Sequence, residues 1–161
     1  RVVKPSLLAL DMYSLAAEQL LVGTAAVESL LGTYLVQVKG PALGAFQMEP
    51  TTYHDIWDHY LLYRTNLKHE VWDLCPRCPN FSEDMRPDAE TMIYDLRYAT
   101  IMARLHYRRV PYPLPRPNSW TDMGRYWKEH YNTSQGKGTI KKFVRAAEDC
   151  GVIPYYNSRR T

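Results

Sequence analysis

The sequence lacks several features that mark specialised classes of protein. Its apolar stretches are broken by Glu, Asp or Gly well before the ~18 residues that a membrane span needs, and no charged start, apolar middle and small-residue cleavage site is visible. No block of five or more like charges occurs, and 20 Lys and Arg against 17 Asp and Glu leave a net charge of only +3. We therefore expect no membrane span and no nucleic-acid partner.

Cysteine is also scarce, and the odd count of three argues against the disulfide framework of a small secreted domain. The pair Cys75 and Cys78 leaves two interpretations open. It is half of a zinc site, completed by His69 and Cys150, or it belongs to a loop with free or locally bridged thiols. Because a single CxxC pair is a weak signal, we predict no metal and no cofactor.

The 161 residues are 45% hydrophobic, which is enough to form one domain with a buried core. Apolar periodicity, caps and breakers predict a mainly helical fold. The helices are expected over residues 6–31, 51–66, 89–107, 119–127 and 139–151. Residues 33–40 alternate in side-chain type and predict a short strand or extended segment after the first helix. A proline-rich, polar composition predicts an inserted surface loop at about 66–88.

One charged residue lies where the helical pattern expects an apolar one. Glu28 shares a helix stripe with Leu21 and Leu31, close to the end of the first predicted helix. Burial and the negative end of the helix dipole both disfavour an ionised carboxylate, so the pattern predicts a raised pKa, as in a general acid. The alternative is that Glu28 lies at the edge of the stripe and reaches water.

Four motifs occur in order along the chain: Ala26-Val-Glu28-Ser29, the segment GPALGAFQMEP from Gly40 to Pro50, the helix from Asp95 to Tyr107, and Tyr131-Asn132 followed by Gly136. In this order and spacing, over roughly residues 20–138, the sequence resembles the lysozyme-like soluble lytic transglycosylase family. The resemblance implies a single α+β lysozyme-like domain over residues 1–161, helical apart from a small extended or hairpin segment after the helix that carries Glu28.

The resemblance also implies a reaction. Glu28 matches the residue that protonates the oxygen between N-acetylmuramic acid and N-acetylglucosamine and then acts as a base on the muramoyl 6-hydroxyl, closing a 1,6-anhydro ring. Because the substrate supplies its own nucleophile, no second carboxylate is needed. Glu49 departs from the family pattern, and as a second carboxylate near the cleft it would favour hydrolysis over ring closure. His106 is expected to be a structural histidine.

The remaining site residues implied by the resemblance are expected to contact substrate: Ser29, Gly44, Gln47, Tyr131 and Asn132. Each of the last four also has a simpler interpretation. Gly44 and Gln47 are equally suited to a turn, Tyr131 to a buried position with any hydroxyl partner, and Asn132 to loop support.

The segments GPALGAFQMEP and YWKEHYNTSQGKGT also resemble segments of proteins from tailed bacteriophages and prophages. This implies a virion or tail protein that acts on peptidoglycan strands at the cell wall or periplasm and contacts other tail or baseplate proteins. Two other functions stay open: a structural tail or baseplate protein that keeps the fold without activity, and a module that binds the wall without cutting it.

Overall fold

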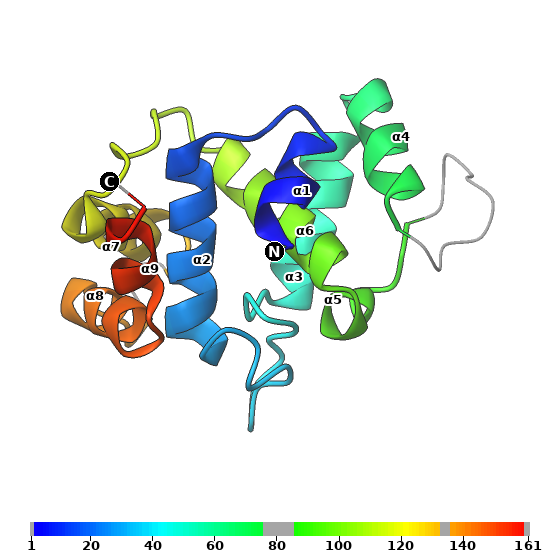
Figure 1. Ribbon diagram of the computed structural model, residues 1–161. Coiled ribbons are helices and arrows are strands. Elements are labelled where there is room, and N and C mark those ends of the chain that lie inside the picture. Colours follow the sequence, from blue (N-terminus) through cyan, green and yellow to red (C-terminus); the bar gives the residue numbers. More distant parts are fainter. Residues whose placement is uncertain (1, 76–85, 133–135, 160–161) are drawn as a thin grey trace.

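The computed structural model describes residues 2–75, 86–132 and 136–159, and these form a mainly helical protein (Figure 1). The helices are α1 (Val3–Leu8), α2 (Leu15–Ser29), α3 (Pro50–Asp55), the π-helical turn η1 (Ile56–Leu61), α4 (Thr65–Asp73), α5 (Thr91–Tyr94), α6 (Leu96–Arg108), α7 (Trp120–His130), α8 (Ile140–Asp149) and α9 (Val152–Asn157). Within these ranges, no helix combines the length and apolar character needed to cross a membrane.

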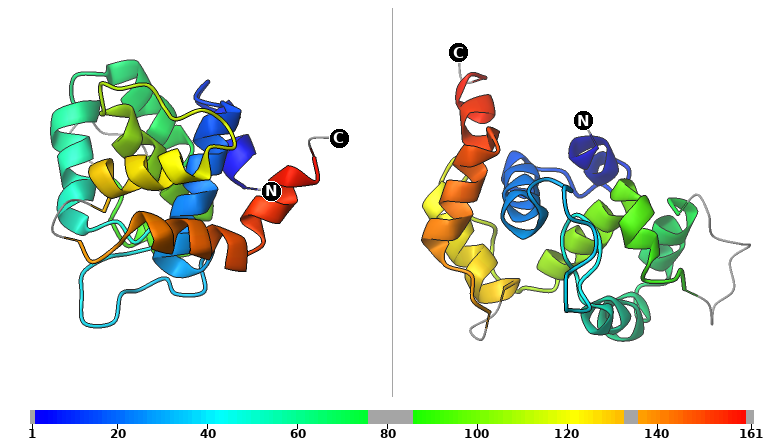
Figure 2. Two further views of the ribbon diagram at one scale, coloured as in Figure 1. Left: turned by 90° about the vertical axis from the view of Figure 1, so that its left-hand side faces the viewer. Right: turned by 90° about the horizontal axis from the view of Figure 1, so that it is seen from below.

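Helix α2 stands between two groups of helices. It packs against α7, α8 and α9 on one side and against α1 and α6 on the other, where α6 also contacts α5 and η1 (Figure 1). Seen from below, the segment that follows α2 runs between the two groups (Figure 2). The end of α2 that carries Glu28 is therefore surrounded by parts of the chain that are distant in sequence.

The helix predicted over residues 6–31 is two helices. Ser14 ends the break between α1 and α2, because its side chain accepts a hydrogen bond from the Ala17 amide at 3.1 Å and so caps α2. At the other end, Leu30 takes a left-handed conformation with φ of 51°. The helix thus ends at Ser29, three residues before Gly32, the glycine expected to stop it.

The extended segment predicted after this helix is present, but as single bridges. Val36 pairs with Leu43, and Leu43 pairs with Met48, each in antiparallel fashion. The Leu43 and Met48 amides each donate to the carbonyl of the other residue at 2.9 and 3.0 Å. Residues 33–48 therefore form an extended segment that folds back on itself. Its pairing consists of isolated bridges, and these residues form no strand longer than a single bridge.

The loop predicted at about 66–88 is wrong for residues 66–73, which belong to α4. The prolines and polar residues that follow dominated the prediction. Leu67 and Val71 nevertheless lie one turn apart, Val71 is buried, and Trp72 packs edge-on against Trp57 with ring centroids 6.3 Å apart. Residues 76–85, which include Cys78, lie outside the described residues.

Capping residues set several other boundaries. Asp95 divides the helix predicted over 89–107, since its Oδ1 accepts a hydrogen bond from the Tyr98 amide at 3.0 Å and starts α6. Thr139 caps α8 through the Lys142 amide at 3.1 Å, as predicted. Helix α7 continues past Trp127 to His130, and α9 is a further helix beyond Gly151.

A glycine permits the contact between α2 and α8. A Cβ atom at Gly23 would overlap the ring of Phe143, which is fully buried. We expect Gly23→Ala to lower the free energy of unfolding by about 1–2 kcal/mol, because overpacking outweighs the gain in helix propensity. Urea denaturation would measure this. In a Phe143→Leu background the cost of Gly23→Ala should shrink, and an equal cost in both backgrounds would contradict the packing explanation.

Candidate functional site

Glu28 lies in the last turn of α2 and is half-buried. Its Oε1 accepts a hydrogen bond from the Trp127 indole Nε1 of α7 at 2.9 Å. The Trp127 side chain is itself buried and packs against Phe143 of α8. Among the residues that the structure describes, the carboxyl group is therefore held by a directed donor from the buried core and by no ion pair.

The surroundings of Glu28 change its acidity in opposing directions. Burial raises the pKa of this carboxyl from 4.5 to about 7, while the Trp127 hydrogen bond and the positive charge of Lys142 each lower it and offset part of the rise. The carboxyl group is therefore protonated at mildly acidic pH, where an ordinary glutamate is ionised. The raised pKa agrees with the one predicted from the helix stripe, and burial is its largest cause.

Two tyrosines lie close to this carboxyl. The Tyr131 hydroxyl donates to the Phe46 carbonyl at 2.9 Å, and the Tyr107 and Thr24 hydroxyls are hydrogen-bonded at 2.8 Å. Burial and the charge of Glu28 raise the pKa of both phenols. Their rings lie 5.2 Å apart. The structure thus places Tyr131 within electrostatic reach of Glu28, with its hydroxyl bonded to the backbone of the extended segment.

Ser29 fastens the end of α2 to the extended segment. Its buried Oγ lies 2.5 Å from the Ala45 carbonyl, to which it donates, and accepts a hydrogen bond from the Gly32 amide at 2.8 Å. These bonds occupy the hydroxyl within the chain. Its observed role is to hold the helix end next to residues 43–48.

Gly44 and Gln47 are both used in the turn of this segment. Gln47 has a φ of 46° and donates from Nε2 to the Gly44 carbonyl at 2.9 Å. Gly44 has a φ of 73°, and a Cβ atom there would overlap the Met92 carbonyl. The backbone at Gly44 thus lies so close to α5 that only glycine fits there. For both residues, the geometry agrees with the turn that the sequence left open.

Asn132 supports the loop after α7. Its Oδ1 accepts hydrogen bonds from Lys128 Nζ at 2.9 Å and from the Gly138 amide at 3.2 Å. Glu49 is exposed and accepts a hydrogen bond from Thr51. The charged group that acts on the pKa of Glu28 is the cation of Lys142. The geometry therefore does not support Glu49 as a second carboxylate that acts together with Glu28.

His106 is held in its neutral form behind Tyr131. Its Nε2 lies 2.8 Å from the His130 carbonyl, to which it donates, and its Nδ1 accepts from Arg109 at 2.8 Å. Burial, followed by the charge of Arg109, lowers the pKa of His106 to about 4. The ring meets Tyr131 edge-on, with centroids 4.8 Å apart. This is the satisfied structural histidine that the sequence predicted.

The cysteines do not assemble a metal site in the described part of the chain. Cys75 is disulfide-bonded and so offers no thiolate, whereas Cys150 is a free, half-buried cysteine. Over residues 2–75, 86–132 and 136–159, no group of three or more His, Cys, Asp or Glu is placed to hold a metal ion.

Sequence reasoning missed three residues around Glu28, namely Trp127, Tyr107 and Lys142. Trp127 lies in the last turn of α7, and Tyr131 directly follows this helix four residues later, a separation that on a helix brings two side chains to one face. That spacing was a usable signal for a pair at one site. The sequence held no comparable signal for Lys142, whose influence depends on how α8 packs against α2.

The raised pKa of Glu28 has a consequence for stability. A raised pKa in the folded state stabilises the protein fully below the unfolded pKa of 4.5, and this contribution is lost as the pH rises through about 7. We expect Glu28→Gln to be more stable than the wild type at pH 8.5, by roughly 1–3 kcal/mol, and to have no such advantage at pH 4.

Urea denaturation at the two pH values measures the difference. Glu18→Gln is the matched control, because Glu18 is also on α2 and accepts a hydrogen bond from an aromatic donor, the Tyr156 hydroxyl, at 2.9 Å. Equal pH dependence in Glu28→Gln and the wild type would contradict the raised pKa.

Comparison with known proteins finds no matching family model, no matching curated protein and no matching solved structure. Function is therefore inferred from the geometry around Glu28 and from the motifs of the sequence.

Proposed function

We propose that this protein is a lysozyme-like lytic transglycosylase or muramidase that cuts the β-1,4 bond between N-acetylmuramic acid and N-acetylglucosamine in peptidoglycan. The observation that carries the proposal is the half-buried Glu28, with a pKa raised to about 7 and one hydrogen bond from Trp127. A carboxyl group that keeps its proton near neutral pH is suited to protonate a glycosidic oxygen.

The reaction needs one carboxyl group in two successive roles. Protonated Glu28 donates its proton to the leaving oxygen as the glycosidic bond breaks. The resulting carboxylate then removes the proton of the muramoyl 6-hydroxyl, whose oxygen closes the 1,6-anhydro ring. If water takes the place of that hydroxyl, the same residue yields a hydrolysis product. The carboxylate formed in the first step is stabilised by Trp127 and Lys142, the groups that lower its pKa.

The protein's surroundings in this proposal are those of a tailed bacteriophage. As part of a virion or tail, the domain would open the cell wall locally, with glycan strands as its substrate and other tail or baseplate proteins as its neighbours. A net charge of +3 gives a small attraction to an anionic envelope. This context comes from the sequence resemblance and applies equally to an inactive relative.

A structural tail or baseplate protein that keeps the fold without activity is the second candidate. The observation that favours it is that the two side-chain amides expected to bind sugar are hydrogen-bonded to other residues of the protein. Gln47 bonds to the Gly44 carbonyl, and Asn132 bonds to Lys128 and Gly138. The Gln47 Nε2 and the Asn132 Oδ1 must give up these bonds before they can bind a glycan.

The decisive experiment digests purified peptidoglycan and identifies the released muropeptides by mass spectrometry. We expect the wild type and the control Glu18→Gln to release products and Glu28→Gln to lose at least about 100-fold in rate, as expected on removal of a general acid. Circular dichroism would verify that both variants are folded. Products lighter by one water than hydrolysis products indicate a transglycosylase, and hydrated products indicate a muramidase.

Activity that survives in folded Glu28→Gln would overturn the role of Glu28. A wild type that releases nothing, under conditions in which a control muramidase digests the same substrate, would favour the structural protein. Binding to insoluble peptidoglycan without release would favour a wall-binding module.

The charge of Lys142 should set the alkaline limit of activity. Because this exposed lysine lowers the pKa of Glu28, we expect Lys142→Gln to raise that pKa and to shift the fall in kcat/KM to higher pH, by a few tenths of a unit. The neighbouring exposed Lys141→Gln is the control for a general change in net charge. An equal shift in both variants, or none in Lys142→Gln, would contradict this.

A further inference from the structure

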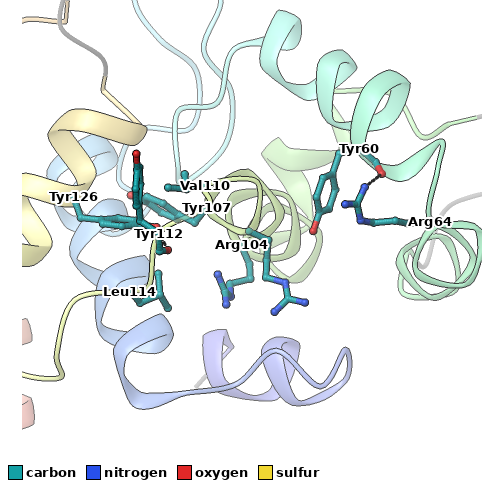
Figure 3. Close-up of a pocket in the computed structure, with 9 residues that line it drawn as sticks. Tyr60, Arg64, Arg104, Tyr107, Val110, Tyr112, Leu114 and Tyr126 are labelled. Atoms are coloured by element: carbon teal, nitrogen blue, oxygen red, sulfur yellow. Dashed lines mark hydrogen bonds between the residues drawn. The ribbon is translucent and has the colours of Figure 1, made fainter.

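A polar pocket is lined by side chains of η1, the turn before α4, α6, α7 and the segment that follows α6. It has a volume of about 380 Å³ and contains three arginines and several tyrosines. In Figure 3, Tyr112 and Tyr126 lie on one side, Tyr60 and Arg64 on the opposite side, and Arg104 between them. We call this hollow the arginine pocket. Its charged lining residues are Arg64, Arg104 and Arg108.

Arg104 is the unusual member of this set. It is only 7% exposed, and its one hydrogen bond to the described residues is a long one, from Nε to the Met12 carbonyl at 3.5 Å. A buried cation without a compensating partner is costly, because burial removes its hydration. Burial and the neighbouring charge of Arg108 lower the pKa of Arg104, yet a guanidinium stays protonated under ordinary conditions.

No carboxylate in residues 2–75, 86–132 or 136–159 lies within ion-pair distance of the three arginines of the pocket. By contrast, Arg86, Arg109 and Arg125 each pair with an aspartate elsewhere on the protein. The arginine pocket thus concentrates positive charge that the described chain leaves uncompensated.

The tyrosines make the pocket suitable for an organic ligand and not only for a bare ion. The Tyr126 hydroxyl donates to the Tyr112 carbonyl at 3.2 Å, which holds these two residues together. On the other side, the Arg64 guanidinium stacks over the Tyr60 ring at 3.9 Å and donates to its carbonyl. The volume lies within the range of small-molecule sites.

We propose that the arginine pocket binds a small organic ligand through a carboxylate or phosphate group. The oxyanion is expected to bind between Arg104 and Arg108, because guanidinium groups match the geometry of planar and tetrahedral oxyanions. The tyrosine side chains then contact the body of the ligand. This site goes beyond the proposed cleavage by Glu28 and does not depend on it. Tyr107 connects the two regions, because it lines the pocket and its hydroxyl bonds to Thr24, one turn before Glu28.

Isothermal titration calorimetry of the whole protein with citrate and with inorganic pyrophosphate tests the site, with uncharged N-acetylglucosamine as the neutral probe. We expect one equivalent of at least one anion to bind, more weakly at higher salt, and N-acetylglucosamine not to bind there. Citrate binding alone assigns a carboxylate ligand, pyrophosphate binding alone assigns a phosphate ligand, and binding of both supports the shared oxyanion site.

The matched variants are Arg104→Gln, Arg108→Gln and Arg97→Gln. Arg97 lies on the same helix, is exposed and does not line the pocket, so its loss changes net charge alone. We expect Arg104→Gln and Arg108→Gln to bind the anion at least about tenfold more weakly than the wild type, and Arg97→Gln to bind it with unchanged affinity. Arg108 is exposed, so its variant should fold even if Arg104→Gln does not. Failure of both anions to bind the wild type, or equal affinities across the three variants, would overturn the proposal.

Discussion

The bond from the Trp127 indole to the Glu28 carboxyl is the interaction on which the candidate site depends. It joins the end of α2 to α7, so the two elements that flank the site are fixed by the same contact that sets the acidity of the carboxyl. An indole N–H supplies a directed dipole without a full charge, and it therefore stabilises the ionised form less than a cation would. This choice of partner leaves burial as the dominant influence, and Glu28 keeps its proton near neutral pH.

The extended segment at residues 33–48 is held by contacts from both sides. Ser29 fixes it to the end of α2, Tyr131 donates to its Phe46 carbonyl, and Gly44 lies directly against α5. Several residues expected to contact a sugar thus contribute first to the framework around Glu28. A framework of this kind limits the movement of the carboxyl group, which favours catalysis if a glycan can enter.

The sequence was sufficient to predict the mainly helical class, the cap at Thr139 and the direction in which the pKa of Glu28 shifts, since these follow from local pattern and helix periodicity. It was insufficient for α4 and for the division of the first helix. Leu67, Val71 and Trp72 form a helix because they pack against the rest of the core, which overrides the proline-rich composition beside them. The roles of Gln47 and Asn132 could not be assigned either, because a side-chain amide suits a turn and a ligand equally well until its partners are known. Lys142 approaches Glu28 only through tertiary packing.

The opposite acidities of Glu28 and His106 balance the proton exchange that accompanies folding. At about pH 5.5, folding lets Glu28 take up a proton, since its pKa rises from 4.5 to about 7. Over the same interval His106 releases a proton, since its pKa falls from 6.5 to about 4. The two changes in bound protons are opposite in sign, so each offsets part of the other. The fold thereby holds a protonated acid and a neutral imidazole at mildly acidic pH, and the contributions of these two groups to the pH dependence of stability oppose each other.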